Sequence, residues 1–147
     1  MVNKKDFLIP LEKFDTKDVK DGHINGSLTV IWRNWDKILK NEPKMVYVSS
    51  VNPGEIKGPH LHKKRNSYFI CIHGKVRFVI KEKSGKYNEL DVNSDFPTIV
   101  FVPNNIASAH YNLSKTVSRI LVLADIAWRP NDNEMENLIF SDYKFKK

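Results

Sequence analysis

The chain has 147 residues, of which 41% are hydrophobic and 28% are charged. This composition is typical of one globular domain covering residues 1–147 and excludes a wholly disordered chain. A single cysteine, Cys71, excludes an internal disulfide framework and favours a reducing compartment, which we take to be the cytoplasm. The 24 basic and 17 acidic residues give a net charge of +7, which is compatible with nucleic acid, an anionic membrane surface or a small polyanionic ligand.

The distribution of charged and apolar residues narrows this choice of partner. The longest uncharged stretch, residues 96–114, is rich in proline and asparagine and is too polar to cross a bilayer. The N-terminus has neither a long apolar core nor a small-residue cleavage site, so we expect no signal peptide. Because the lysines are spread along the chain and no nucleic-acid-binding motif is present, we expect neither nucleic acid nor membrane as partner.

Short apolar runs rich in Val, Ile, Phe and Tyr follow one another along the chain, which favours strands over helices. In chain order the predicted strands are Ser27–Trp32, Met45–Val51, Tyr68–Ile72, Lys75–Ile80, Thr98–Val102 and Arg119–Ala124. Only Asn34–Asn41 has a weakly helical pattern, and Cys71 lies inside a run, as a core residue would. The pattern predicts an all-β sandwich or barrel whose mouth can hold a ligand.

The segment from Gly54 to Gly74 carries the most specific pattern of the sequence. His60 and His62 are two positions apart, so on a strand both side chains would face the same pocket. The basic residues that flank this pair are Lys57, Lys63, Lys64 and Arg65. A pocket with this lining would suit a small polyanionic ligand.

Three interpretations stay open for His60, His62 and His110. Three imidazoles can bind Zn²⁺, Fe²⁺ or Mn²⁺. One histidine can instead act as an acid–base catalyst that takes a proton from carbon. A histidine on a strand can also be a half-buried residue with a satisfied hydrogen bond and no further role. Because two histidines share one face among cations, we favour a functional site here and a structural role for His23 and His73.

The spacing of the histidine segment resembles the first motif of the cupin family. That motif is a glycine, five residues, H-x-H, three or four residues, a glutamate, six residues and a second glycine. Gly54, His60, His62 and Gly74 match it, and Ser67 stands in the position of the glutamate. The resemblance implies a cupin jelly roll. Because metal cupins commonly use that glutamate as a ligand, its replacement by serine ranks a metal site second.

Two families of RmlC-like cupins that act on nucleotide-linked sugars are similar to this chain. Lys57-Gly58-Pro59-His60 resembles the R-G-x-H hallmark of the dTDP-4-dehydrorhamnose 3,5-epimerases, in which the histidine is the catalytic base. Gly58–Lys63, followed by the Tyr68–Ile72 run, resembles the R-G-x-H-A-H-K hallmark of the WxcM-like dTDP-sugar 3,4-ketoisomerases. Pro103–Asn112 is similar to the second cupin motif.

These resemblances imply an isomerase that uses no metal or organic cofactor and acts on an NDP-linked, most simply dTDP-linked, 4-keto-6-deoxyhexose in polysaccharide biosynthesis. His60 would remove the proton alpha to the keto group, with His62 as its partner or as a second proton carrier. Tyr47 would be the acid, because Trp128 stands near the position of the epimerases' tyrosine and cannot donate a proton. The candidate substrate contacts are Lys57, Arg65, Tyr68, Arg77, His110 and Asn112.

The resemblance also implies a homodimer, because both families often exchange N-terminal strands. Residues 1–26 are then the candidate exchange arm. The residues leave open whether the reaction is epimerisation at C3, epimerisation at C3 and C5, or keto migration. Two alternative functions also stay open: a metal-dependent cupin enzyme that uses His60, His62 and His110, and a non-catalytic sugar-binding cupin.

Overall fold

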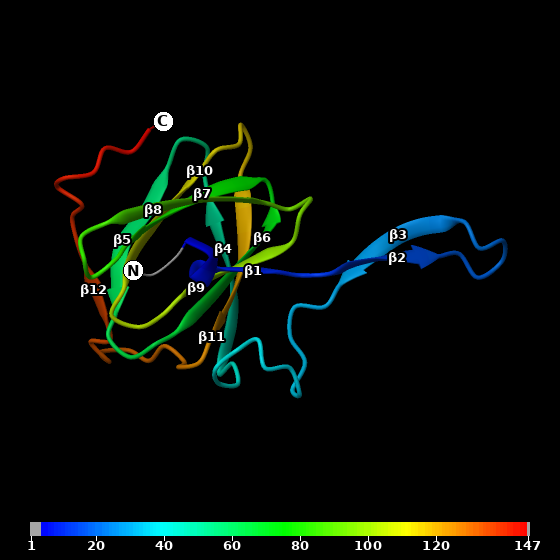
Figure 1. Cartoon of the computed structure of the whole chain (residues 1–147), viewed down its shortest axis with the longest axis horizontal. Coiled ribbons are helices and arrows are strands. Elements are labelled where there is room, and N and C mark those ends of the chain that lie inside the picture. Colours follow the sequence, from blue (N-terminus) through cyan, green and yellow to red (C-terminus); the bar gives the residue numbers. More distant parts are fainter. Residues whose placement is uncertain (1–3, 147) are drawn as a thin grey trace.

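The computed structural model describes residues 4–146, and strands make up nearly all of its regular structure. A body of packed sheets carries a hairpin that extends away from it (Figure 1). In chain order the elements are η1 (Lys4–Phe7), β1 (Leu8–Pro10), β2 (Lys13–Lys17), β3 (Ile24–Thr29), β4 (Met45–Val51), β5 (Ile56–His62), β6 (Ser67–His73), β7 (Lys75–Lys81), β8 (Tyr87–Asn93), β9 (Thr98–Val102), β10 (Ala107–Asn112), β11 (Ser118–Ala124) and β12 (Met135–Asn137). No helix among these residues has the length and apolar character needed to span a membrane.

Two five-stranded sheets form the body, as the sequence predicts for an all-β sandwich. One has the strand order β1-β9-β6-β11-β4 and the other β12-β5-β10-β7-β8, with antiparallel pairing in both. The chain passes from one sheet to the other at most connections, so strands far apart in sequence become neighbours. In particular, β5 lies between β10 and β12, which brings the histidine strand beside the C-terminal part of the chain.

The core lies between the sheets and is built from the inward-facing residues of both. Phe69 and Val122 come from one sheet and Phe78 and Leu90 from the other, and none is more than 9% exposed. Because alternate residues of a strand face opposite sides, the intervening positions of the outer strands meet solvent. Cys71 is part of this core, and burial raises the pKa of its thiol to about 11, so it is a packing residue as expected.

The segment predicted as weakly helical, Asn34–Asn41, forms turns and bends instead, so that prediction is wrong. The Arg33 side chain and backbone bind the Asp36 carboxylate, which fixes a tight turn. Leu39 then packs against the outer face of β6, where the Tyr68 hydroxyl accepts a hydrogen bond from the backbone N–H of Lys40. Burial of these side chains on the sheet outweighs the weak helical pattern of a short segment.

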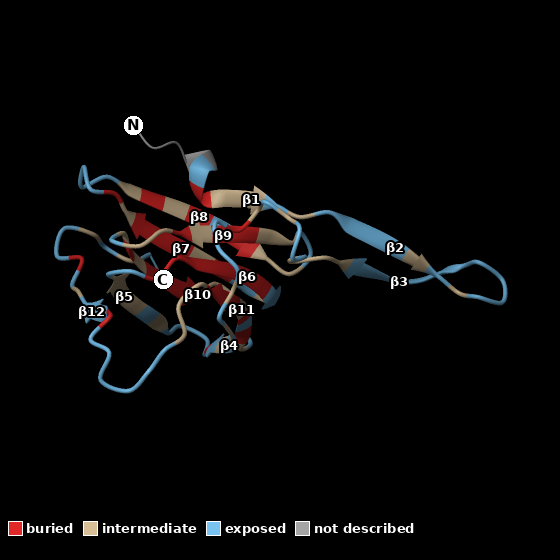
Figure 2. Ribbon diagram, turned by 90° about the horizontal axis from the view of Figure 1, so that it is seen from below, coloured by how far each residue is buried: buried red, intermediate tan, exposed pale blue. Residues whose placement is uncertain are grey.

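The hairpin of β2 and β3 is exposed along most of its length (Figure 2). The predicted strand Ser27–Trp32 lies three residues late at both ends, because β3 runs from Ile24 to Thr29. Phe14 and Leu28 are directly paired across the ribbon and stay about half exposed, at 48% and 49%. A two-stranded ribbon with an exposed apolar pair is marginally stable on its own.

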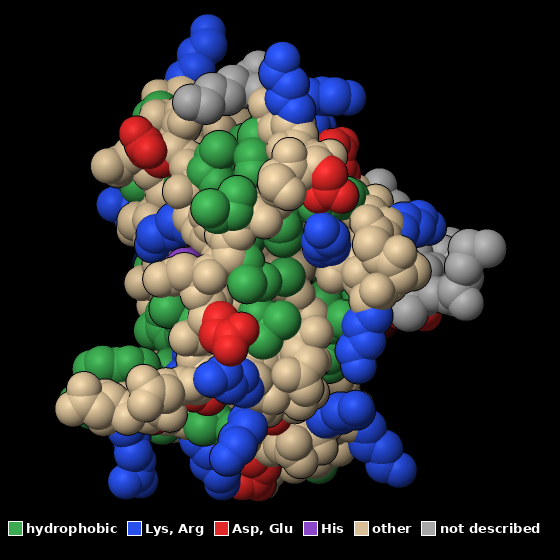
Figure 3. Space-filling view, turned by 90° about the vertical axis from the view of Figure 1, so that its left-hand side faces the viewer, with side chains coloured by type: hydrophobic (Ala, Val, Ile, Leu, Met, Phe, Trp, Pro, Cys, Tyr) green, Lys and Arg blue, Asp and Glu red, His purple; other side chains and the backbone are tan. Residues whose placement is uncertain are grey.

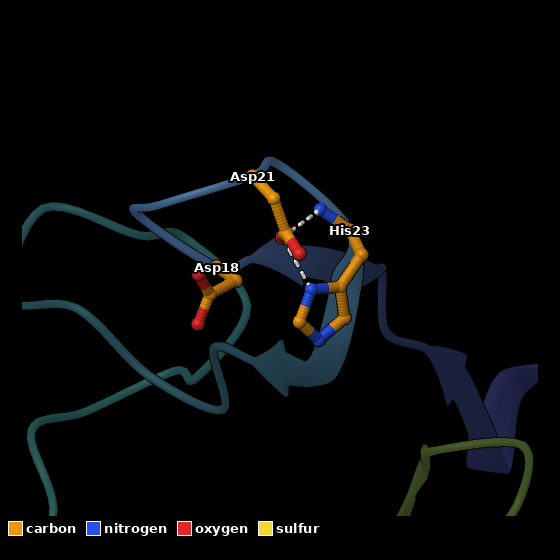
Figure 4. Close-up of side chains that lie close together, drawn as sticks. All are labelled: Asp18, Asp21 and His23. Atoms are coloured by element: carbon orange, nitrogen blue, oxygen red, sulfur yellow. Dashed lines mark hydrogen bonds and ion pairs between the residues drawn. The ribbon is translucent and has the colours of Figure 1, made fainter.

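The turn of the hairpin holds Asp18, Asp21 and His23 together (Figure 4). Among residues 4–146, this is the one group of three His, Cys, Asp or Glu side chains whose ligand atoms lie within 4.8 Å of one another. Their atoms are occupied by the turn itself: Asp18 accepts from the backbone N–H of Lys20, and the His23 ring contacts Asp21. The group therefore shapes an exposed turn.

Candidate functional site

A cavity of about 200 Å³ opens between the two sheets at the histidine strand. Strands from both sheets line it, so the pocket forms only when the whole body is folded. The lining residues are Tyr47, Ser49, Lys57, His60, His62, Arg65, Ser67, Phe69, Val102, Ser108, His110 and Met135. The structure thus brings together both predicted catalytic histidines, Tyr47 and three of the six predicted substrate contacts.

Gly58 explains how β5 approaches its neighbour closely enough to place the histidines. Its φ is +87°, and a Cβ at this position would lie 2.9 Å from the carbonyl oxygen of Ser108 on β10. Only glycine accepts both the conformation and the contact. With Gly58 in place, His60 pairs with Ser108 across the sheet, and alternation along β5 places His62 on the same side.

Asn137 on β12 and Glu134, the residue just before β12, fix the orientation of the two imidazoles. The Nδ1 atom of His60 lies 2.9 Å from Asn137 Oδ1, and Nδ1 of His62 lies 2.6 Å from Glu134 Oε2. Both partner oxygens are acceptors, so in the neutral ring each Nδ1 carries the hydrogen and donates it. This leaves Nε2 of each ring with a lone pair that can take a proton. The geometry therefore suits histidines acting as bases.

Glu134 connects the His62 ring to the turn that follows β5. Its carboxylate accepts from the His62 ring and from the backbone N–H groups of Lys64 and Arg65. Burial alone would raise the pKa of Glu134, but these hydrogen bonds hold that pKa below its ordinary value. A buried, ionised carboxylate thus orients His62 and ties down the turn that follows β5.

Tyr47 and His110 complete the polar lining. Burial raises the pKa of the Tyr47 phenol, with the Arg65 charge acting in the opposite direction, so the hydroxyl stays protonated and can donate. Burial and then the charges of Lys57 and His60 lower the pKa of His110 to about 3, so its ring is neutral. The ring packs against Phe78 and Phe69, and Nε2 has no hydrogen-bond partner.

Three predicted substrate contacts lie away from the cavity, so the proposed site leaves them out. Tyr68 faces the outer side of its sheet and bonds the backbone of Lys40. Arg77 lies on the outer face of the other sheet, in a bidentate ion pair with Asp91. Asn112 is buried at the end of β10, where its amide bonds the carbonyl oxygens of Val51 and Thr116. Each of these side chains has a structural task.

Sequence reasoning assigned no role to the two residues that orient the histidines. Both lie in the polar segment that follows Trp128. Both are more than 70 positions from the histidines they contact. The only sequence signal was a carboxylate and an amide in a polar segment, which is common in any loop.

The chain matches one family of known proteins, and its fold matches several solved structures. The model of the family described as FdtA, WxcM-like, C-terminal matches residues 9–144. No curated protein matches the chain. A solved dTDP sugar isomerase from Desulfovibrio desulfuricans G20 is 16% identical, with a TM-score of 0.75 over 90% of this chain and 82% of its own.

Two further solved structures share the fold. The sugar 3,4-ketoisomerase QdtA from Thermoanaerobacterium thermosaccharolyticum, in complex with TDP, is 22% identical, with a TM-score of 0.69 over 88% of this chain and 85% of its own. The dTDP-6-deoxy-D-glucose-3,5-epimerase RmlC from Legionella pneumophila is 12% identical, with a TM-score of 0.73 over 92% and 73%. At these identities the likeness establishes the fold. With the family match over nearly the whole chain, the protein belongs to the WxcM-like (FdtA) family and has the RmlC-like cupin fold.

Proposed function

We propose that the protein is a nucleotide-sugar isomerase acting on an NDP-linked 4-keto-6-deoxyhexose, with keto migration between C4 and C3 as its reaction. The observation that carries the proposal is the pair His60 and His62, whose rings share one cavity and are held at Nδ1 by Asn137 and Glu134 respectively. Support also comes from QdtA, whose structures hold TDP and, in a histidine variant, TDP-4-keto-6-deoxyglucose.

The chemistry needs a base, a donor on oxygen and a place for the proton. His60 takes the C3 proton, whose electron pair forms the C3–C4 double bond as the carbonyl pair moves to O4. O4 gains a proton and the C3 hydroxyl loses one, for which Tyr47 and His62 are the candidate carriers. Return of a proton to C4 then gives the 3-keto sugar with no net gain or loss of electrons.

The size of the cavity supports an arrangement with the sugar inside and the nucleotide outside. At about 200 Å³ it is smaller than the 300–1,000 Å³ typical of sites that enclose a drug-sized ligand. A second cavity, of about 400 Å³, has Glu134 in its lining and contains the side chains of Lys63, Lys64 and Arg129. Three cations beside one another suit a diphosphate. On the face shown in Figure 3, lysine and arginine side chains are distributed from top to bottom.

The test is deuterium uptake from D₂O during incubation with dTDP- and GDP-linked 4-keto-6-deoxyhexoses, read by NMR. Deuterium at C4 together with a keto group at C3 supports the proposal. Label at C3 alone, or at C3 and C5 with inversion, would assign epimerisation instead. Elemental analysis of untagged protein accompanies the assay. About one metal per chain that is lost in His62→Ala would instead favour the metal-dependent cupin.

Glu134→Gln tests the orientation of His62. The amide keeps the shape and can accept from the backbone N–H groups, but it removes the charge beside the imidazole. We expect kcat to fall by about 10- to 100-fold with KM nearly unchanged, the size seen when an orienting partner is removed. Steady-state kinetics measure this. Glu136→Gln, an exposed neighbour on β12, is the control, and an equal loss there would contradict the role of Glu134.

We also propose a homodimer in which the β2–β3 hairpin packs on a second copy. Phe14 and Leu28 pair with each other on the hairpin and stay about half exposed. Val46 and Val48 on the edge strand β4 are 56% and 54% exposed. Of the arm predicted at residues 1–26, residues 1–3 lie outside the described part of the chain. The hairpin itself covers 13–29 and so extends three residues beyond that arm.

The double substitution Phe14→Asp/Leu28→Asp is expected to convert the dimer to a monomer, because two carboxylates replace an apolar pair at the interface. Light scattering after size-exclusion chromatography measures the mass. Val19→Asp, at the 98% exposed tip of the hairpin, is the control and should leave a dimer. A monomeric wild type, or a dimer that survives the double substitution, would contradict the proposal.

A further inference from the structure

Arg65 is a buried cation in the wall of the histidine cavity. The residue is only 5% exposed, and its Nε has no hydrogen-bond partner. Burying a guanidinium without partners is costly, because the group loses its hydration and receives little in exchange. A folded protein keeps such a group when something else supplies the missing acceptor. The unfilled donor therefore points to a ligand.

The nearby carboxylate does not fill this role. Glu134 Oε2 lies 4.0 Å from Arg65 Nε, at the outer limit of an ion pair and beyond a hydrogen bond. The same carboxylate already accepts from the His62 ring and from two backbone N–H groups. Glu134 thus lowers the cost of placing a positive charge here while leaving donors of Arg65 for another acceptor.

Two more unpartnered polar atoms belong to the same cavity. Ser67 Oγ and His110 Nε2 are buried without a hydrogen bond, and with Arg65 Nε they are the only such side-chain atoms found among residues 4–146. Native proteins bond almost all buried polar atoms, so three exceptions at one place are informative. They mark a part of the wall built to meet oxygen atoms of a bound molecule.

The charges that line the cavity indicate which kind of oxygen atom a bound molecule places there. Lys57 and Arg65 line it, whereas its lining contains no Asp or Glu. Lys57 Nζ already donates to Ser49 Oγ at 2.6 Å. Arg65 Nε is buried without an acceptor in the cavity that also holds the base, and it can donate to a carbonyl oxygen that gains negative charge as the adjacent carbon loses its proton.

We propose that Arg65 is a catalytic residue that binds the keto oxygen of the sugar and stabilises the enediolate oxygen formed when His60 removes the alpha proton. This inference rests on the proposed isomerase function and replaces the expectation that Arg65 contacts the nucleotide. As the C–H pair moves into the new C=C bond, the carbonyl pair moves onto the oxygen, and Arg65 donates to it. No further reactant is needed.

The kinetic test compares Arg65→Met and Arg65→Lys with Arg119→Met, an exposed arginine on β11. Arg65→Met is expected to lower kcat for deuterium exchange by about 10²- to 10³-fold, as loss of an oxyanion donor does. Its affinity for dTDP alone, measured by calorimetry, is expected to stay within about threefold of wild type, because the nucleotide does not reach Arg65. Arg65→Lys restores part of kcat, because it keeps the charge without the planar fork.

Two kinetic results would overturn the assignment. If dTDP affinity falls as steeply as kcat/KM while kcat holds, Arg65 contacts the nucleotide as the sequence suggested. If Arg65→Met keeps both kcat and affinity, Arg65 has no role in the reaction. Should Arg65→Met fail to fold, the comparison of Arg65→Lys with wild type decides: a lower kcat at unchanged dTDP affinity supports the assignment, and an unchanged kcat contradicts it.

A second measurement judges Arg65 without turnover, so that failure of the proposed function is seen separately. The ¹⁵N–¹H signal of Arg65 Nε, identified by its loss in Arg65→Lys, is followed in wild type during titration with sodium acetate. We expect a saturable shift of this signal and none for Arg119. Absence of the shift would overturn the inference even if the protein isomerises sugars, whereas a shift without any sugar exchange would overturn the isomerase proposal alone.

Discussion

His60→Asn is expected to abolish deuterium exchange into the 4-keto sugar, with a loss of about 10²- to 10⁴-fold, the range that a positioned general base contributes. Asparagine keeps a polar group of similar size on β5 but has no nitrogen that can accept a proton at neutral pH. The variant is expected to bind dTDP like the wild type, because in the proposed arrangement His60 faces the sugar and not the nucleotide.

His73→Asn is the matched control, since His73 is exposed and ends β6, the next strand in the sequence, which belongs to the other sheet. Circular dichroism verifies that both variants fold, and NMR of the sugar in D₂O gives the exchange rates. Full exchange by His60→Asn would show that the base lies elsewhere. Loss in His62→Asn alone would move the base role to His62, whose Nδ1 is held by a carboxylate rather than an amide.

The pocket's two histidines were predictable because their arrangement is local. An H-x-H pattern on a strand places both rings on one face whatever the rest of the fold does. Arg77 was expected to contact the substrate, but Val76, Phe78 and Ile80 alternate as a buried face and place Arg77 on the outer one, away from the cavity. The fold class was equally accessible, since strand-length apolar runs recur through the whole chain.

Tyr68 shows where local reasoning stops. It lies in YFICI, which is apolar at every position, so the sequence carries no alternation to tell the inner from the outer face. The structure buries both faces of β6, with Phe69 in the core between the sheets and Tyr68 against Leu39 outside. A shift of one residue in the register of β6 would have placed Tyr68 in the core between the sheets and Phe69 on the outer face.

Glu134 and Asn137 could not be assigned because their role depends on long-range pairing. They reach the histidines only because β12 pairs with β5, with Asn137 opposite His60 and Met135 opposite His62. Strand β12 has three exposed residues and no strand pattern of its own. Its position is decided by the edge of a sheet that the rest of the chain must build first.

Acidification is expected to destabilise the protein steeply because of His110. The ordinary pKa of histidine is 6.5, which the unfolded chain regains, whereas burial and then the charges of Lys57 and His60 lower the folded pKa to about 3. Between these values the unfolded state binds one proton more than the folded state, so the free energy of unfolding falls as the pH falls. Above the ordinary pKa both states are neutral, and the group then adds no pH dependence.

The size of the effect follows from the same linkage. Each pH unit inside that window costs about 1.4 kcal/mol, so lowering the pH from 6.5 to 5 is expected to remove about 2 kcal/mol. That loss is a large fraction of a typical domain's stability of about 5–15 kcal/mol. Urea unfolding followed by tryptophan fluorescence at a series of pH values measures it.

His110→Phe removes the titrating group and keeps an aromatic ring beside Phe69 and Phe78. Its free energy of unfolding is expected to fall less steeply with falling pH than that of the wild type. Between pH 6 and pH 5, unfolding of the variant takes up about one proton fewer. His23→Phe, at the exposed turn of the hairpin, should keep the wild-type slope. Equal slopes in His110→Phe and wild type would mean that His110 takes up its proton inside the folded pocket. A charged His110 would then face His60 and Lys57 at low pH and oppose the uptake of a proton by the base. The loss at low pH would in that case be seen in the activity and not in the free energy of unfolding.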